Sequence, residues 1–431
     1  MSSRIVRLRR SRYGVVGENV TARLGALGSI FVATLLLARN DGASAVGVYA
    51  LLHVLPGLVG TVMSCGLPGA VAYFHAGASR EDRRLPSTIV ALCAAGGIGG
   101  ALLWLAAAPL IREPLFPKLG VGLVMLVAGL VVTRIVVTTA KSCSQGTEDL
   151  WGSNRVIFTE EFMFLPAYGV VTVAGGTSFT AVVLGLLLAD VATATLAWSR
   201  LVRQGFFANV DRPSLELGRQ VAAYGIRAQL GTVVSQLNLR LDFILLTVIA
   251  GPAVVGVYAV ASKFAELVKI VGMSLSYVLY PRFAREAGAR ALATVKRLLP
   301  QAALATGACV VPLFALAPIL IPAVYGSAFR GAIVPAQIIL VGLVFEGVGG
   351  LLTGYLYGVG RAGRNSWAMA AGLAVTLILD LTLIPRYGST GAAIASALAY
   401  STTTAALVAL TWRDLTGRER PIVPAQGAAK A

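Results

Sequence analysis

Residues 237–280 decide the fold of this chain, because they hold two apolar runs joined by a single turn. The first run contains the letters LNLRLD, which begin at Leu237, and it stays apolar to Ala250. After the Gly251-Pro252 turn, the second run reads VVGVYAVASKFAELVKIVGMSLSYVLY over residues 254–280. A helix that crosses a bilayer needs about 20 apolar residues, so the second run predicts a transmembrane helix.

Three charged residues interrupt this second run: Lys263, Glu266 and Lys269. Their regular spacing places them on one broad face of a helix. Charged side chains inside a membrane are costly, so they are usually paired or functional. Two interpretations stay open: the face binds an anionic substrate, or it is a structural Lys–Glu–Lys network.

The composition is typical of a membrane protein. Of the 431 residues, 57% are hydrophobic and only 13% are charged, whereas a soluble domain carries about 25% charged residues. The formal net charge of +17 is explained by Lys and Arg in cytoplasmic loops. No RNP, zinc-finger or helix-turn-helix pattern accompanies that charge, so nucleic acid is not an expected partner. The sequence predicts an all-α polytopic membrane protein.

Twelve apolar segments are long enough to be candidate spans, and the longest hydrophilic stretch separates them into two groups of six. We therefore expect an N-terminal six-helix lobe (1–199), a cytoplasmic linker (200–220), a C-terminal six-helix lobe (221–412) and a disordered cytoplasmic tail (413–431). The predicted spans cover residues 17–38, 46–74, 86–110, 119–141, 156–175, 178–199, 221–250, 254–280, 299–322, 333–358, 367–384 and 390–412.

The basic residues predict how the chain is oriented. If the N-terminus is cytoplasmic, the segments on that side hold 25 of the 36 Lys and Arg residues and the opposite side holds five. Cytoplasmic loops of membrane proteins collect Lys and Arg. Both termini are therefore expected in the cytoplasm.

An internal repeat supports the division into two lobes. The letters VGVYA at residues 46–50 recur at residues 255–259, an offset of 209, and both copies open the second span of their lobe. Two lobes of six spans each predict a parallel repeat about an axis along the membrane normal, with the substrate between the halves. The charged positions of the second copy are apolar or small in the first: Val54, Gly57 and Gly60.

The basic residues at membrane depth suggest an anionic ligand. Arg23, Lys263 and Lys269 outnumber Glu266, the nearest candidate partner. An uncompensated cation suits a substrate that brings its own negative charge, and Arg and Lys are the side chains that bind phosphate. The sharper hypothesis is thus a phosphorylated substrate.

Other charges within spans have several interpretations. Glu346 lies about 13 residues from either end of its span, so it must pair, take up a proton or bind an ion. Four further residues can snorkel to an interface or form interhelical pairs: Arg134, Arg227, Asp190 and Asp380.

No catalytic or cofactor motif is apparent. The sequence has no Walker A loop, G-x-S-x-G or H-E-x-x-H pattern. The four cysteines lie in or next to apolar runs without a C-x-x-C pair, and His53 and His75 have no metal-ligand spacing. We expect a transporter rather than an enzyme, with no cofactor and no metal.

Two stretches resemble the polysaccharide flippases of the multidrug/oligosaccharidyl-lipid/polysaccharide exporter superfamily. The first comprises Arg240-Leu-Asp242, Gly251, the VGVYA segment, Ala261, Lys263 and Tyr280-Pro281-Arg282-Phe283; the second comprises Pro385-Arg-Tyr387-Gly388 and Gly391-Ala392-Ala393-Ile394-Ala395.

The resemblance implies a twelve-helix, two-lobed bundle with a cationic cavity. Such proteins move an undecaprenyl-pyrophosphate-linked oligosaccharide across the bacterial inner membrane, by alternating access coupled to an H⁺ or Na⁺ gradient. Family members place basic residues of spans 1, 7 and 8 against the pyrophosphate, which by position implies Arg23, Arg240, Lys263 and Lys269. Asp242, Glu266 and Glu346 are the candidates for ion coupling or cavity pairing. Candidate protein partners are a polysaccharide polymerase and glycosyltransferases.

Two other hypotheses stay open. A multidrug/cation antiporter of the same superfamily would rest on Glu346 and Asp380, although its relatives favour acidic cavities. A scaffold for a glycan-assembly complex would need none of the cavity charges.

Overall fold

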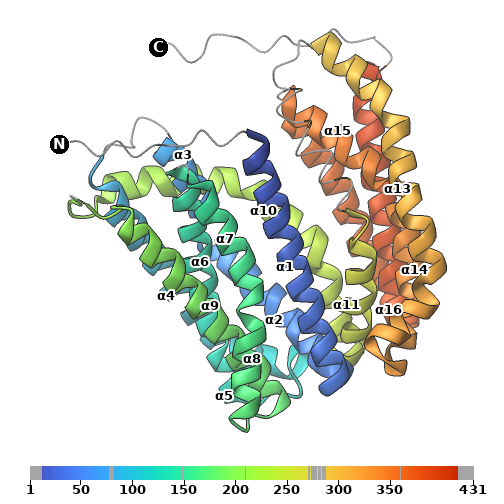
Figure 1. The fold of residues 1–431 in the computed structure, drawn as a ribbon, viewed down its shortest axis with the longest axis horizontal. Coiled ribbons are helices and arrows are strands. Elements are labelled where there is room, and N and C mark those ends of the chain that lie inside the picture. The colour runs from blue at the N-terminus through green and yellow to red at the C-terminus, as the bar shows by residue number, and fades with distance from the viewer. Residues whose placement is uncertain are drawn as a thin grey trace. The chain divides into compact units, whose positions relative to one another are not determined.

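A computed structural model describes most of the chain: residues 12–76, 82–147, 149–208, 210–269, 288–359 and 361–415, with Gly272, Leu279 and Phe283. Every regular element within these residues is helical (Figure 1). Nine of the described helices are long and apolar enough to cross a membrane. The N-terminal arm, most of the second half of the predicted eighth span and residues 416–431 lie outside the described residues.

The chain divides into two compact units, one of residues 1–36 and 52–233 and the other of residues 37–51 and 234–431. The two predicted six-helix lobes with a linker at 200–220 stay a prediction. Arg39 explains why the short segment 37–51 belongs with the second unit. Its guanidinium donates hydrogen bonds of 2.8 Å to the carbonyl oxygens of Ala323 and Val324.

Helix α6 lies at the centre of the first unit, where it packs against α3, α4, α7 and α9. Small residues on α6, among them Ala140, Ser144 and Gly146, are buried, and small residues allow transmembrane helices to approach closely. The helices of this unit are most of α1 (Arg12–Asn40), the second half of α2 (Gly42–Met63), α3 (Leu67–Ala76), α4 (Leu85–Leu115), α5 (Val121–Leu126), α6 (Ala128–Gly146), α7 (Leu150–Phe162), α8 (Phe164–Val173), α9 (Ser178–Arg203) and the first part of α10 (Leu215–Ala250).

The expected continuous span 46–74 is broken in the structure. Helix α2 ends at Met63, and α3 begins at Leu67. Cys65 and Gly66 have φ values of 47° and 73°, in the left-handed region that ends a helix. An apolar pattern does not reveal such a break, because both helices that flank it are equally hydrophobic.

Helix α16 (Ala362–Leu415) organises the second unit and packs against α14 and α15 (Figure 1). Its backbone leaves the helical conformation at Gly388, where φ is 53°. The eleventh and twelfth predicted spans lie on either side of this kink, so the count of twelve stays a prediction. The other helices are α11 (Pro252–Glu266), α13 (Gly288–Tyr325), η2 (Ser327–Ala332), α14 (Ile333–Gly342), η3 (Leu343–Phe345) and α15 (Glu346–Gly358).

Helix α13 remains continuous although it contains four prolines. Pro318 has no N–H, so the carbonyl group of Phe314 loses its partner one turn earlier. The side-chain amide of Gln337, on α14, donates to that oxygen at 3.1 Å. A neighbouring helix therefore supplies the hydrogen bond that the proline removes, as expected inside a membrane.

The two VGVYA copies meet where α2 and α11 cross. A Cβ atom added to Gly47 would overlap the carbonyl oxygen of Pro252, and one added to Gly256 would overlap that of Ala43. Because Ala43 and Pro252 are also 209 positions apart, the two contacts are reciprocal. Glycine at both positions is what permits backbone-to-backbone packing here.

Candidate functional site

The predicted turn between spans 7 and 8 is present at Gly251. Helix α10 ends at Ala250, Gly251 has a φ of 83°, and Pro252 is the first residue of α11. Glycine adopts this conformation without steric cost, and proline favours the first helical position. The turn fixes where α11 begins and therefore which of its residues share a face.

The structure brings three of the four predicted phosphate-binding residues around one carboxylate. Glu266 interacts electrostatically with Lys263, Lys269 and Arg240, and we call these four residues the cationic cluster. The Lys263 Nζ atom lies 2.8 Å from Glu266 Oε2. The side chains of this pair keep 26% and 23% of their surface exposed, so a ligand can reach them.

Lys269 has a different environment. Its Nζ atom lies 3.1 Å from the hydroxyl oxygen of Tyr400 and 4.4 Å from the centre of that ring. Glu346, which begins α15 after the short helix η3, interacts electrostatically with Lys269. The negative charge of Glu346 therefore attracts Lys269, and its role in pairing or ion binding stays a prediction.

A buried polar core lies in the same unit. The Tyr258 hydroxyl donates to Asp242 Oδ2 at 2.5 Å and lies 2.9 Å from Ser396 Oγ. Ser396 also lies 3.3 Å from the same carboxylate oxygen, and the backbone N–H of Phe243 donates to Asp242 Oδ1 at 2.9 Å. Asp242 is thus held by α11 and α16 as well as by its own helix.

Asp380 lies near this core and is fully buried. Neither carboxylate oxygen has a hydrogen-bond partner among the described residues, and the group interacts electrostatically with Asp242. Burying these two carboxylates, of which Asp380 lacks a hydrogen bond among the described residues, costs free energy unless a proton or a cation neutralises them. Across the described residues, no group of three or more His, Cys, Asp or Glu side chains could hold a metal ion.

Arg23 belongs to the first unit, on α1. Its side chain is exposed, and its Nε atom donates to Asn19 Oδ1 at 3.0 Å. The Asn19 amide in turn donates to Asn154 Oδ1 on α7 at 2.6 Å. Arg23 is therefore oriented by α7 through Asn19, while its guanidinium stays accessible.

Sequence reasoning missed Tyr258, Tyr400 and Ser396. Tyr258 was visible only as part of the repeat, and its partner Ser396 is 138 positions away. Tyr400 likewise lies 131 positions from Lys269. Contacts over such separations leave no local pattern to detect.

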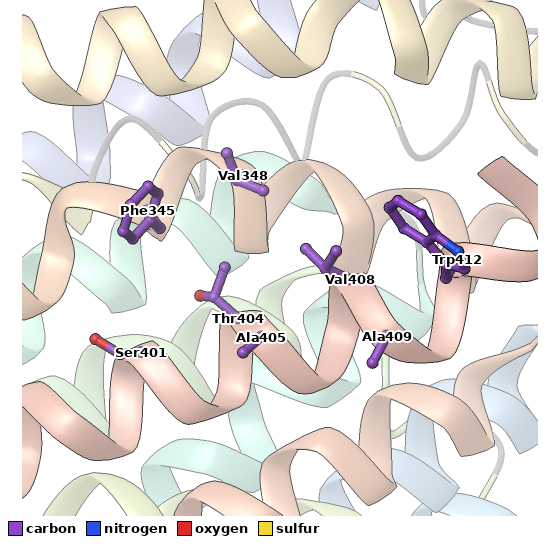
Figure 2. Close-up of a pocket in the computed structure, with 8 residues that line it drawn as sticks. All are labelled: Phe345, Val348, Ser401, Thr404, Ala405, Val408, Ala409 and Trp412. Carbon is purple, nitrogen blue, oxygen red and sulfur yellow. The ribbon is translucent and has the colours of Figure 1, made fainter. Parts of the chain in front are cut away.

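An apolar groove of about 780 Å³ runs between α15 and α16. Figure 2 shows it between the segment that carries Phe345 and Val348 and the face of α16 from Ser401 to Trp412. None of the predicted site residues lines it. The groove is therefore separate from the predicted site. Two of its lining residues, Phe345 and Ser401, are sequence neighbours of Glu346 and Tyr400.

Comparison with known families gives a direct match over most of the chain. Residues 19–286 match the family described as "Polysaccharide biosynthesis protein". The chain is also 20% identical, over 387 residues, to the probable low-salt glycan biosynthesis flippase Agl15 of Haloferax volcanii; the match covers 89% of this chain and 80% of that protein.

Solved structures show the same fold. The inward closed conformation of the lipid II flippase MurJ matches with a TM-score of 0.71 at 14% identity, over 93% of this chain and 89% of that one. An inward-facing multidrug resistance transporter of the MATE family matches with a TM-score of 0.65 at 15% identity, over 94% of each chain.

Proposed function

The chain belongs to the polysaccharide biosynthesis protein family, and from that premise we propose that it is a flippase for a lipid-linked oligosaccharide. It moves an undecaprenyl-pyrophosphate-linked glycan from the cytoplasmic to the outer leaflet of the bacterial inner membrane, by alternating access coupled to an ion gradient. The observation that carries this proposal is the cationic cluster, in which three basic residues of the predicted seventh and eighth spans share Glu266.

In the cationic cluster, a phosphate group of the substrate can replace the Glu266 carboxylate as the counter-ion of the basic residues. Glu266 neutralises Lys263 at 2.8 Å, which lowers the cost of holding an ammonium group at membrane depth. A pyrophosphate brings at least as much negative charge and can take over Lys263 and Arg240. Lys acts on phosphate as a point charge and Arg as a two-pronged donor. Arg23, which belongs to the first unit, stays a separately predicted phosphate ligand.

Ion coupling is assigned to the buried acids. Asp242 and Asp380 repel each other while both are ionised, so a proton or Na⁺ bound there relieves the repulsion. The hydroxyl oxygens of Tyr258 and Ser396, which lie within 2.9 Å of one another, surround the Asp242 side of such a site. Lys269 interacts electrostatically with both Asp242 and Glu346, and it therefore links the buried acids to the other members of the cationic cluster.

The proposed architecture is twelve spans in two lobes related by a parallel repeat, with both termini cytoplasmic. The reciprocal contacts of Gly47 and Gly256 support the repeat, because a two-fold axis between the copies would make each contact the image of the other. The 25-to-5 distribution of basic residues supports the orientation.

The test is transport in proteoliposomes that contain a lipid-pyrophosphate-linked sugar. Accessibility of the sugar on each leaflet is measured for the parent protein and for the Lys263→Ala/Lys269→Ala variant. We expect the parent to move the sugar and the variant to lose most of that activity. Transport unaffected by the substitutions would remove the cationic cluster from the mechanism, and no transport by folded parent protein would overturn the flippase itself.

A multidrug/cation antiporter is the second candidate, and the unsatisfied Asp380 carboxylate is the observation that favours it. Such a protein would export organic cations in exchange for H⁺ or Na⁺. Deletion of the gene distinguishes the two candidates. Loss of surface polysaccharide with unchanged drug sensitivity supports the flippase, and the opposite pattern supports the antiporter.

A further inference from the structure

A short series of hydrogen bonds joins α1 to α7 within the first unit. The Nε atom of Arg23 donates to Asn19 Oδ1 at 3.0 Å, and Asn19 Nδ2 donates to Asn154 Oδ1 at 2.6 Å. The two helices also pack closely here, because a Cβ atom added to Gly25 would lie 2.8 Å from the Phe158 ring. We call Arg23, Asn19 and Asn154 the α1–α7 relay.

Arg23 determines the direction of both hydrogen bonds in the relay. A guanidinium group can only donate, so the atom of Asn19 that faces it is the amide oxygen. The amide nitrogen of Asn19 then faces Asn154 and needs an oxygen there as its acceptor. The orientation of each amide group follows from its partners in this way, and the Nδ2 group of Asn154 is directed away from Asn19.

This Nδ2 group has no hydrogen-bond partner among the described residues, although Asn154 keeps only 7% of its surface exposed. A buried donor without an acceptor costs free energy and requires an explanation. Asn365 of α16, which is 4% exposed, gives the contrast. Its Oδ1 atom accepts from Thr353 at 3.0 Å, and its Nδ2 atom donates to Tyr357 at 3.1 Å. The missing acceptor is therefore a property of the site around Asn154.

The groups that the relay leaves available are all donors. Arg23 is exposed and forms no ion pair with the described carboxylates, so its Nη atoms are available beside the Asn154 Nδ2 group. Both amide oxygens of the relay already accept hydrogen bonds. A set of donors next to an uncompensated guanidinium suits an ionised phosphate, which only accepts. A sugar hydroxyl would also need an acceptor for its own proton.

The relay lies at the depth where the phosphate of a membrane lipid is expected. Arg23 and Asn154 are near the first residues of their candidate spans, Thr21–Asn40 and Leu150–Val173. The hydrogen bonds through Asn19 place both side chains at one level. Lipid phosphates occupy the headgroup region, just outside the hydrocarbon core that such spans cross. In the predicted orientation, this level is at the cytoplasmic face.

We propose that Arg23 and Asn154 together bind a phosphate group at this level, with Asn19 as a positioning residue that holds both side chains. The phosphate enters along the exposed Arg23 side chain, and one of its oxygens accepts from the buried Nδ2 group of Asn154. Phosphate binding itself is independent of transport. That the phosphate belongs to the lipid-linked substrate, taken up from the cytoplasmic leaflet, rests on the proposed flippase function.

The direct test is binding of two probes, inorganic pyrophosphate and undecaprenyl pyrophosphate, to the full chain in phosphatidylcholine nanodiscs. We expect Asn154→Leu to weaken binding about tenfold, because it removes a hydrogen bond to a charged group. Asn154 is neutral, so this loss should be the same at low and high salt. The loss caused by Arg23→Gln should instead shrink as salt is added.

Asn365→Leu is the matched control, since it removes a buried asparagine that is hydrogen-bonded at both ends of its amide group. It should lower the melting temperature more than Asn154→Leu does, and it should leave binding unchanged. An Asn154→Leu protein that binds both probes as the parent does would overturn the site. A buried water would then be the acceptor of the Nδ2 group.

The role of Asn19 is tested by a double-mutant cycle on binding. Asn19→Leu should weaken binding by itself, because it frees both Arg23 and Asn154 from their fixed orientations. The loss caused by Asn154→Leu should then be smaller in the Asn19→Leu background than in the parent. Independent losses would refute the positioning role of Asn19.

The two probes also distinguish the source of the phosphate. An effect of Asn154→Leu on both probes means that the site recognises pyrophosphate itself, and an effect on the lipid probe alone means that it recognises a membrane-anchored headgroup. A folded parent that binds neither probe would overturn the site. If binding depends on Asn154 but the parent moves no lipid-linked sugar in proteoliposomes, the proposed function fails and the phosphate site stands.

Discussion

Gly47 of α2 and Gly256 of α11 face each other so closely that a Cβ atom on either would lie 3.1 Å from the backbone nitrogen of the other. Each added atom would also overlap a carbonyl oxygen of the opposite helix. The two contacts lie at the same crossing point of α2 and α11. A shift of either helix that relieved one contact would therefore disturb the other.

The first prediction follows from this crossing. Gly47→Ala and Gly256→Ala should each destabilise the protein by about 1–3 kcal/mol or more, because overpacking against backbone cannot be relieved by a side-chain rotation. Thermal unfolding in detergent measures the effect. Gly57→Ala in the same helix is the control, since a Cβ there meets nothing within 4 Å. Equal melting temperatures for Gly47→Ala and Gly57→Ala would contradict the close packing.

Asp380→Asn should stabilise the folded protein and at the same time impair its coupling to the ion gradient. The substitution removes a buried carboxylate that has no hydrogen-bond partner among the described residues, so we expect a gain of about 1–3 kcal/mol. The same change should abolish the dependence of transport on the ion gradient. Asp211→Asn, at an exposed position, should change neither property. A less stable Asp380→Asn protein would show that the carboxylate is satisfied.

The C-terminal end of α9 gives a prediction about pH. Burial raises the pKa of Asp149, but hydrogen bonds from Arg200, Gln204 and the Gly152 N–H outweigh it and hold the pKa below its ordinary value of 3.8. A lowered pKa in the folded state stabilises the protein above that ordinary value. The contribution is lost as the pH falls through the folded pKa.

Asp149→Asn should therefore lower the melting temperature at neutral pH, and its difference from the parent should shrink below about pH 4. Asp82→Asn is the comparison, because its pair with Arg84 is local and exposed and such pairs contribute little. A difference for Asp149→Asn that stays constant from neutral to acid pH would refute the assignment.

The hydrogen bond from Gln337 to Phe314 can be tested by a double-mutant cycle. Gln337→Leu leaves the carbonyl oxygen without its donor and should cost about 1–3 kcal/mol. Pro318→Ala restores the N–H that normally bonds this carbonyl within the helix. Gln337→Leu should therefore cost less in the Pro318→Ala background, and an unchanged cost would show that the amide is not needed.

The sequence predicted those features that depend on local chemistry. The Gly251-Pro252 turn was predictable because each residue favours its position in a turn followed by a helix. The shared face of Lys263, Glu266 and Lys269 followed from helical spacing alone. The break at Cys65 and Gly66 was not predictable, since it lies within one apolar run.

The sequence missed the charged group of Arg134, Glu160, Glu161, Asp190 and His53 for a different reason. Glu160 and Glu161 lie near the start of the predicted fifth span, where charged residues are common, so they drew no attention. His53 was considered only as a metal ligand and lacked the spacing for one. Arg134 and Asp190 were expected to snorkel or to pair, and the structure shows the pair at 3.2 Å. What joins all five is tertiary packing of four helices.

The amide that Gln337 offers to Phe314 also bears on the order in which the membrane protein is made. Ribosomal synthesis completes α13 before α14, so a lone α13 would enter the hydrocarbon with the Phe314 carbonyl unsatisfied, at a cost of several kcal/mol. Waiting in the translocation channel until Gln337 emerges avoids that cost. Helices α13 and α14 are thus expected to leave the channel as a hairpin rather than one after the other.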